Sequence, residues 1–323
     1  MKILVITPIR GISEIYSRLA NAFDSLDYLP DASYAELMSL SQSYDVVFTN
    51  PNRSKVYIDQ TLCERLKIKI VCTASTGTAH IDQSVISSAN ILVISLKDQI
   101  ERLSVVTSTA EHAVALTLLA ARKLPSALQH VKSGGWDCEP FIGCQLSTTT
   151  VGIVGMGRLG SIYGKIMSAF GARVIFYDPY VSDEVGLENY ERVNSLAALF
   201  TECNVISLHV HLNLETSKMI CSEILECARN DLILVNTSRG GIVMEDDLLK
   251  HMSKPGANMI YATDVVTDEV IDLQNSAILS AYKNNTHSDR LIVTPHLGGM
   301  THKARATAYN IAVDLLFEAI NAY

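Results

Sequence analysis

Short apolar runs alternate with longer segments of helical periodicity along the whole chain of 323 residues. In the first hundred residues the runs predict four strands, at 2–7, 45–49, 69–73 and 91–95. A second series begins at Val151 and predicts six more, at 151–154, 173–177, 205–208, 232–236, 259–263 and 291–293. Strands and helices that alternate in this way form parallel sheets with helices on both faces. The pattern therefore predicts an α/β protein with two doubly wound parallel sheets.

Two helical segments bear on how the sheets are joined. The segment 109–124 is apolar on nearly all sides, so we expect it to be buried between domains or subunits. The segment 303–319 follows the second series of strands and is free to pack back on the first domain. Two sheet domains in tandem should leave a cleft, in which a cofactor and a small substrate would meet.

A glycine-rich turn follows the first strand of the second series. Gly155, Gly157 and Gly160 have the spacing Gly-x-Gly-x-x-Gly, with Arg158 and Leu159 between them, and a helix is predicted at 162–170. This arrangement lets a helix N-terminus face a pyrophosphate. Asp178 ends the next predicted strand, where a carboxylate accepts the adenosine ribose hydroxyls and repels a 2′-phosphate. The motif predicts NAD rather than NADP; the alternative is a glycine-rich turn with an incidental aspartate.

Composition excludes several function classes. A net charge of −8 and the lack of a basic run argue against a nucleic-acid partner. No apolar segment is long enough to span a bilayer, and the N-terminal run resembles a buried strand more than a signal peptide. The seven cysteines form no Cys-x-x-Cys pair, which favours reduced thiols in a cytoplasmic protein. Cys221 and Cys227 lack partner histidines, so we predict no metal site.

Three polar residues follow predicted strands of the second series, at the edge where open parallel sheets bind ligands. Arg239 lies in a glycine-containing turn, and its planar guanidinium suits a substrate carboxylate. His296 can take or give a proton near neutral pH, and Glu269 can pair with its imidazole and orient it. Each also has a structural alternative: a loop salt bridge for Arg239, a buried hydrogen-bonded ring for His296 and a solvated carboxylate for Glu269.

Several motifs together resemble the D-isomer-specific 2-hydroxyacid dehydrogenases. The resemblance covers nearly the whole chain. It rests on the glycine turn with Asp178, on Asn236-x-x-Arg239-Gly240, on Asp264-Val265 leading to Glu269, on Thr294-Pro-His-Leu-Gly-Gly299, on Thr109-Ala-Glu-His and on Gly77-Thr-Ala-His-Ile-Asp82. Departures from the family pattern are Met244, His211 and Val270, and the loop from Val270 to Arg290 is longer than in common members.

The resemblance implies a role for each matched residue. His296 would be the general acid/base, Glu269 would tune it, and Arg239 would bind the carboxylate and carbonyl of the substrate. Backbone amides near Thr76 and Gly77 would bind the same carboxylate. Asp264 would hold the nicotinamide carboxamide. The residues assigned to cofactor binding are Gly155, Gly157, Arg158, Leu159, Gly160, Asp178, Val210, Thr237, Asp264, Thr109 and Gly299.

The resemblance also implies an architecture. A Rossmann NAD-binding domain at 101–295 would be inserted into a flavodoxin-like substrate domain built from 1–100 and 296–323. The helix that begins at Thr109 resembles the family's dimer-forming helix, so we expect a homodimer. We expect no regulatory domain after Tyr323.

The predicted function is an NAD-dependent oxidoreductase that transfers a hydride between nicotinamide and C2 of a 2-hydroxy or 2-oxo acid. The alternative is a non-enzymatic, NAD(H)-sensing protein similar to the corepressors that share this fold. Formate dehydrogenases also share it, but they carry glutamine at the position of Glu269. The sequence does not name the acid; Asn52 and Arg53 are candidates for the substrate pocket, and Arg53 is a candidate for a second anion such as a phosphate.

Overall fold

The chain folds into two compact units in a computed structural model that describes residues 1–12, 14–51, 56–181 and 190–322. Unit 1 comprises Met1–Val106 and Met300–Tyr323, and unit 2 comprises Thr107–Gly299. Both divisions lie a few residues beyond the predicted ones at 100 and 295. Leu103 packs in the core of unit 1, and the Gly298 amide donates to Asp264 of unit 2, so these contacts move the boundaries.

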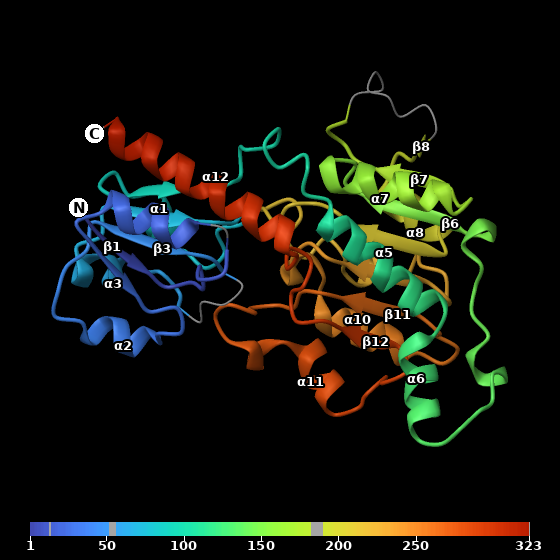
Figure 1. Cartoon of the computed structure of the whole chain (residues 1–323). Helices are drawn as coiled ribbons and strands as arrows, with labels where there is room; N and C mark the ends of the chain where they lie inside the picture. Colours follow the sequence, from blue (N-terminus) through green and yellow to red (C-terminus); the bar gives the residue numbers. More distant parts are fainter. Residues whose placement is uncertain (13, 52–55, 182–189, 323) are drawn as a thin grey trace. The chain divides into compact units, whose positions relative to one another are not determined.

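Unit 1 is built on a parallel five-stranded sheet of order β2-β1-β3-β4-β5, the flavodoxin-like order (Figure 1). Its strands are β1 (Lys2–Val5), β2 (Ser25–Tyr28), β3 (Val46–Thr49), β4 (Ile70–Thr73) and β5 (Leu92–Ile94). Its helices are α1 (Ile15–Ala22), α2 (Tyr34–Ser39), α3 (Gln60–Leu66), α4 (Gln83–Ile86) and α12 (His302–Asn321).

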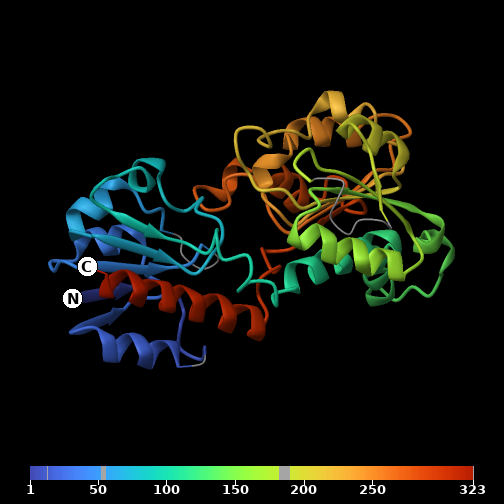
Figure 2. The ribbon, with the colours of Figure 1, turned by 90° about the horizontal axis from the view of Figure 1, so that it is seen from above.

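Alternate residues of the central strands in unit 1 enter two separate cores. In β1, Ile3 and Val5 pack with α1 and α12, whereas Leu4 packs with α2, α3 and α4. The C-terminal helix α12 therefore belongs to the fold of unit 1, and Figure 2 shows it running along one face of that sheet. Its buried side chains include Ile311 and Leu316.

Unit 2 is built on a parallel seven-stranded sheet of order β12-β11-β10-β9-β6-β7-β8, the Rossmann order with one further strand at its edge. Its strands are β6 (Thr150–Val154), β7 (Arg173–Tyr177), β8 (Glu191–Arg192), β9 (Val205–Leu208), β10 (Ile233–Asn236), β11 (Ile260–Thr263) and β12 (Leu291–Val293). Its helices are α5 (Ser108–Ala121), α6 (Leu124–Lys132), α7 (Arg158–Ala169), α8 (Leu196–Glu202), α9 (Ser222–Leu225), α10 (Glu245–Met252) and α11 (Ala277–Lys283). Short 3₁₀ turns span Glu139–Phe141, Leu146–Thr148, Gly240–Ile242 and Leu273–Asn275. The predicted α/β class with two doubly wound parallel sheets is confirmed.

The apolar helix predicted at 109–124 differs from the structure in its end and in what buries it. Helix α5 ends at Ala121, because Lys123 takes a left-handed conformation with φ of 50° and α6 then begins. Ala113 and Leu116 of α5 pack on the sheet of unit 2 together with α7. The apolar character of α5 thus serves its own unit, and the exposed apolar residues lie in α6 and beyond.

Two edge strands were missing from the prediction. Ser25–Tyr28 of β2 pairs only with β1, and the two residues of β8, which pair with β7, are both exposed. Both strands are short and neither is a continuous apolar run, so the sequence pattern does not mark them. Among the described residues, no helix combines the length and apolar character needed to cross a bilayer.

Candidate active site

The glycine turn between β6 and α7 forms the first part of the site. Gly155 has a φ of 90°, and a Cβ added to it would lie 2.7 Å from Val210 Cγ1, so Val210 sits directly on the turn. Gly157 is the N-cap of α7 and provides no side-chain cap, while a Cβ added to it would meet nothing within 4 Å. The first N–H groups of α7 therefore border open space, as a pyrophosphate site requires.

Asp178 follows β7 and lies at the same turn. Its Oδ2 accepts the Met156 amide at 2.8 Å, and its Oδ1 accepts the Tyr180 amide at 2.9 Å. A carboxylate oxygen has two acceptor positions, so both oxygens can still accept a ribose hydroxyl. The position fits the role predicted from the sequence.

Three further residues assigned to the cofactor lie nearby in the chain. Leu159 packs partly on the core beneath α7, and Arg158 is half-buried, with a pKa that burial lowers below its ordinary value. Thr237 follows β10 and is buried, yet its Oγ1 has no hydrogen-bond partner among the described residues. An unpaired buried hydroxyl is costly unless a ligand satisfies it, so Thr237 fits a cofactor contact.

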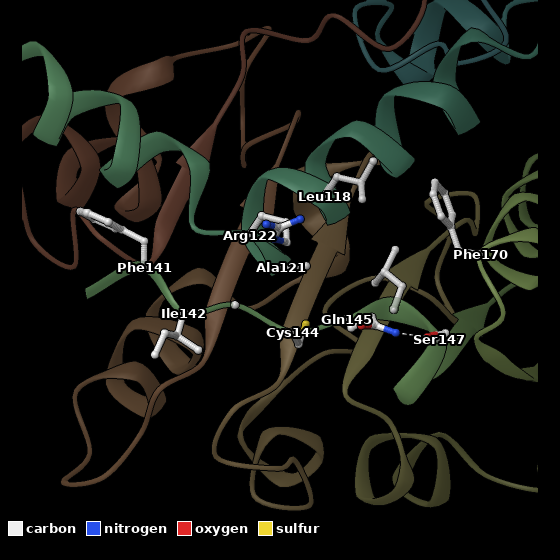
Figure 3. A pocket seen from close by; sticks show the side chains of 11 residues that line it. Leu118, Ala121, Arg122, Phe141, Ile142, Cys144, Gln145, Ser147 and Phe170 are labelled. Atoms are coloured by element: carbon white, nitrogen blue, oxygen red, sulfur yellow. Dashed lines mark hydrogen bonds between the residues drawn. The ribbon is translucent and has the colours of Figure 1, made fainter. Parts of the chain in front are cut away.

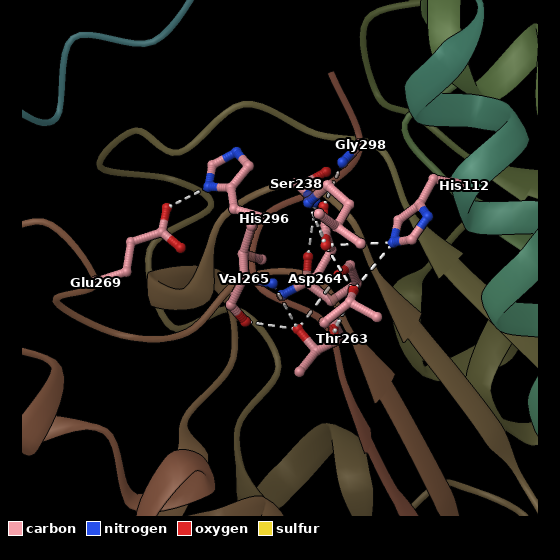
Figure 4. Close-up of polar contacts among 11 residues, drawn as sticks. His112, Ser238, Thr263, Asp264, Val265, Glu269, His296 and Gly298 are labelled. Atoms are coloured by element: carbon pink, nitrogen blue, oxygen red, sulfur yellow. Dashed lines mark hydrogen bonds and ion pairs between the residues drawn. The ribbon is translucent and has the colours of Figure 1, made fainter. Parts of the chain in front are cut away.

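Asp264, directly after β11, is a buried hub of hydrogen bonds (Figure 4). Oδ1 accepts Thr294 Oγ1 and the Leu297 amide at 2.6 and 2.7 Å, and Oδ2 accepts the Gly298 amide at 2.7 Å. His112 Nε2 of α5 lies 3.2 Å from Oδ1. Burial by itself would raise the pKa of Asp264, but these hydrogen bonds outweigh it and hold the pKa below its ordinary value.

This hub has two consequences. It ties the segment after β12 to the end of β11, and it leaves Oδ2 with one acceptor position for a carboxamide N–H. His112 and Thr294 were not predicted as members of this cluster. The one sequence signal for His112 was its spacing from Thr109, since residues three apart are neighbours on one face of a helix.

The imidazole of His296 faces the carboxylate of Glu269. Nδ1 lies 2.8 Å from Glu269 Oε1, and the two side chains are 26% and 20% exposed. His296 has a left-handed φ of 57°, and its amide donates to the carbonyls of Asp264 and Thr294, both at 3.0 Å. Such a conformation is costly for a residue with a Cβ and persists because these bonds hold it. No described residue hydrogen-bonds to Nε2, so this nitrogen can exchange a proton with a ligand.

Arg239 lies in the turn after β10 and completes the group. The half-buried guanidinium donates from Nη1 to the Ser238 carbonyl at 2.6 Å, and Asn236 Nδ2 donates to the Arg239 carbonyl at 3.0 Å. Burial lowers the pKa of Arg239, and the negative charge of Glu269 partly offsets this. Arg239, Glu269 and His296 follow the neighbouring parallel strands β10, β11 and β12, so the three predicted catalytic residues come after the same edge of the sheet in unit 2.

The remaining predicted residues fall in different places. Gly298 packs on Thr109, since a Cβ added to Gly298 would lie 3.1 Å from Thr109 Cγ2, whereas Gly299 borders open space. Thr76 and Gly77 follow β4 in unit 1, where Ser75 Oγ donates to the Gly77 carbonyl at 2.6 Å. Their substrate role stays a prediction. Asn52 and Arg53 lie outside the described residues.

A buried histidine beside the glycine turn should make stability depend on pH. His209 Nε2 lies 2.9 Å from Ser207 Oγ, its Nδ1 has no partner among the described residues, and burial lowers its pKa to about 3. Below the unfolded value of 6.5 only the unfolded chain takes up this proton. The free energy of unfolding should therefore fall by about 2 kcal/mol between pH 6.5 and 5. Urea titrations of wild type and His209→Gln measure this, and an equal pH dependence in both would contradict the assignment.

Comparison with known proteins decides the family. Residues 114–298, more than half of the chain, match the family model of the D-isomer-specific 2-hydroxyacid dehydrogenase, NAD-binding domain. The chain belongs to this family. The glycine turn, Asp178 and Asp264 all lie within the matched NAD-binding segment, so the cofactor of this dehydrogenase family is NAD, as predicted.

Curated relatives of this dehydrogenase family give the same picture. The chain is 31% identical over 322 residues to D-3-phosphoglycerate dehydrogenase of Archaeoglobus fulgidus. The matched residues make up 99% of the chain but 57% of the relative. It is 30% identical over 265 residues to glyoxylate reductase of Thermococcus litoralis, covering 77% of the chain and 73% of the relative. The chain spans about half the length of the phosphoglycerate dehydrogenases that it matches.

Solved structures share the fold. NAD-dependent formate dehydrogenase from Staphylococcus aureus, solved in complex with NAD, has a TM-score of 0.84 at 24% identity and covers 100% of this chain and 96% of that one. D-lactate dehydrogenase from Aquifex aeolicus, complexed with NAD and lactic acid, has a TM-score of 0.78 at 24% identity, with the same coverage. These likenesses concern the fold.

Proposed function

We propose that the protein is an NAD-dependent D-2-hydroxyacid dehydrogenase that interconverts a 2-hydroxy acid and its 2-oxo acid. The observation that carries the proposal is the 2.8 Å contact between His296 Nδ1 and Glu269 Oε1, at the ligand-binding edge of an NAD-binding domain. The nearby Arg239 adds a cation suited to the substrate carboxylate and carbonyl. A proton donor and an anion clamp are what reduction of a 2-oxo acid needs.

Each residue has a separate task in the reducing direction. Arg239 orients the carboxylate and polarises the carbonyl, because its two parallel N–H donors match two oxygens. NADH, which the glycine turn, Asp178 and Asp264 would hold, would supply the hydride when bound. His296 gives the proton at Nε2 to the carbonyl oxygen, while Glu269 stabilises the protonated ring through Nδ1. The guanidinium and the imidazolium together stabilise the negative charge that develops on the oxygen.

The first test is turnover. Purified protein should oxidise NADH in the presence of at least one member of a series of 2-oxo acids of increasing size, glyoxylate to 2-oxo acids with long or phosphorylated side chains. Loss of NADH absorbance measures the rate. A protein that binds NADH with micromolar or better affinity but reduces none of the series would favour the NAD(H)-sensing alternative.

Cofactor choice should depend on the charge of Asp178. Asp178→Ala should weaken NADH binding about 10- to 100-fold, since a hydrogen bond to a charged group contributes about 1.5 to 3 kcal/mol. It should also reduce the preference of the protein for NADH over NADPH. Asp178→Asn is the companion variant: it removes the charge and keeps an acceptor for the Met156 amide, but it places an amide donor opposite the Tyr180 amide. Fluorescence titration with both cofactors measures the effect. Equal use of NADPH by the wild type would refute this role of Asp178.

We also propose a homodimer formed through the surface that follows α5. Five apolar side chains between α6 and residue 142 are exposed, Trp136 by 91% and Leu128 by 67%. The full set is Leu124, Leu128, Val131, Trp136 and Ile142. Next to them lies a groove of about 610 Å³, bordered by Leu118, Phe141 and Phe170, where the segment 141–147 runs beside the end of α5 (Figure 3). Exposed apolar side chains that gather along one stretch of the chain in this way support burial against a second copy.

Light scattering at micromolar concentration should therefore give about twice the chain mass of 35.3 kDa. Leu128→Glu should shift the equilibrium towards the monomer, because it places a charge in the contact. Leu214→Glu makes the same change at a fully exposed leucine outside this surface and should leave the mass unchanged. A monomeric wild type would rule the dimer out.

A cytoplasmic location is the last part of the proposal. All seven cysteines are free thiols, and Cys63, Cys72 and Cys203 are buried. Free cysteine thiols are typical of proteins in reducing compartments such as the cytoplasm.

A further inference from the structure

A buried carboxylate outside the three predicted catalytic residues contacts the segment that carries Glu269. Glu245, the first residue of α10, is 8% exposed. Its Oε1 accepts the Thr267 amide at 2.7 Å, and its Oε2 accepts Ser276 Oγ at 2.9 Å and the Ile278 amide at 3.1 Å. One carboxylate therefore joins both ends of the segment 267–278.

The two ends are themselves rigid. Ser276, 1% exposed, caps α11 by accepting the Leu279 amide at 3.0 Å, so its hydroxyl is fixed when it donates to Glu245. Thr267 follows Val266, whose backbone packs against Gly240: a Cβ added to Gly240 would lie 2.0 Å from the Val266 carbonyl carbon. Because Gly240 follows Arg239 in the chain, the segment 239–245 contacts the start of the Glu269 segment twice.

The segment between these anchors is bent. Asp268, next to Glu269, has a left-handed φ of 54°, and its carbonyl accepts the amides of Ile271 and Asp272 at 2.9 Å. Such a conformation costs of order 1 to 3 kcal/mol and persists when the surroundings determine it. The three hydrogen bonds of Glu245 supply that constraint, because a buried carboxylate loses its compensation if any donor moves away.

We propose that Glu245 is a positioning residue that holds the Glu269 segment at both ends and thereby keeps the Glu269 carboxylate against His296. The inference rests on the proposed function for its catalytic consequence, and on the hydrogen bonds alone for its structural part. Within the described residues, the Glu245 carboxylate accepts hydrogen bonds from Thr267, Ser276 and Ile278. It acts through Glu269, so its loss should matter only where Glu269 matters.

A double-mutant cycle tests this action. Glu245→Gln keeps the size of the side chain but turns one acceptor into an amide donor that faces donors. It should lower kcat for 2-oxo acid reduction about 10- to 100-fold, as small displacements of catalytic groups do, with the KM for NADH little changed. The alkaline limb of the pH profile for reduction should move to lower pH, as it should in Glu269→Gln, because in both variants the protonated His296 ring loses the carboxylate that stabilises it. In the Glu269→Gln background the same change should cost less than about twofold.

A purely structural role gives a different result: Glu245→Gln would then lower kcat by the same factor in both backgrounds, and the proposal would be wrong. Glu245→Asp keeps the charge but shortens the reach, so its kcat should lie between those of the wild type and Glu245→Gln. It replaces Glu245→Gln in this test if the amide variant folds poorly. Asp45→Asn is the matched control in unit 1, where the carboxylate accepts the Lys2 amide at 2.9 Å and pairs with Lys69. It should leave kcat and the pH profile unchanged.

Hydrogen exchange separates this inference from the proposed function. Amides in 266–278 should exchange faster in Glu245→Gln than in the wild type, and those of β7 should not. If the wild type reduces no 2-oxo acid, the proposed function fails and the exchange result alone decides whether Glu245 holds the segment. Unchanged exchange in 266–278 overturns the inference whatever the activity.

Discussion

His296→Ala should lower the rate of 2-oxo acid reduction about 100- to 10,000-fold while NADH binding stays close to that of the wild type, because general acid catalysis contributes about that factor. The His296 imidazole is the candidate proton donor, because its Nε2 has no hydrogen-bond partner among the described residues. Its Nδ1 contacts Glu269 Oε1 at 2.8 Å. Steady-state rates with a saturating 2-oxo acid, together with NADH fluorescence titration, measure the two quantities.

His296 also has an unusual backbone, so folding must be checked separately. Its left-handed φ of 57° is held by the carbonyls of Asp264 and Thr294. His296→Asn is a useful companion, since asparagine tolerates this conformation better than most residues but cannot act as an acid near neutral pH. Both variants should lose turnover alike and unfold near the wild-type temperature. Near-wild-type turnover by His296→Ala would require a different proton donor.

Arg239→Ala should reduce kcat/KM for the 2-oxo acid by at least about 100- to 1000-fold, the effect of removing one donor to a developing oxyanion. Arg239→Lys should recover only part of this loss. An ammonium restores the charge but not the planar pair of donors that matches a carboxylate. Since the guanidinium also binds substrate, the KM for the 2-oxo acid should rise, while the KM for NADH should not.

The hydrogen bonds around Arg239 suggest a control variant for this experiment. The Asn236 amide holds the Arg239 carbonyl at 3.0 Å, so the turn should keep its shape when only the side chain changes. Ser238→Ala removes a neighbouring hydroxyl that donates to the Leu208 carbonyl and should affect stability more than kcat/KM. If Arg239→Ala changed neither the KM nor kcat for any 2-oxo acid, the anion clamp would lie elsewhere.

The sequence alone predicted the elements whose own residues form a recognisable pattern. Buried central strands such as β6 and β9 are continuous apolar runs, and the glycine turn before α7 has a fixed spacing, so both were predicted close to their observed positions. Edge strands were not, because β2 and β8 are short and lack a continuous apolar run, and only their pairing with β1 and β7 defines them. Helix α5 was predicted to end three residues too late, since the left-handed Lys123 leaves no apolar signal.

The sequence also determined which residues follow the strands, and Arg239, Glu269 and His296 were predicted from that position alone. Only the tertiary structure decided which atoms meet. Glu269 and His296 are 27 residues apart, and Asp264 takes its partners from α5 and from the segment after β12. Glu245 reaches a segment more than 20 residues away. A carboxylate at a helix start predicts a solvated end charge, and its burial against Thr267, Ser276 and Ile278 results from the packing of α10 beside α11, which no local pattern encodes.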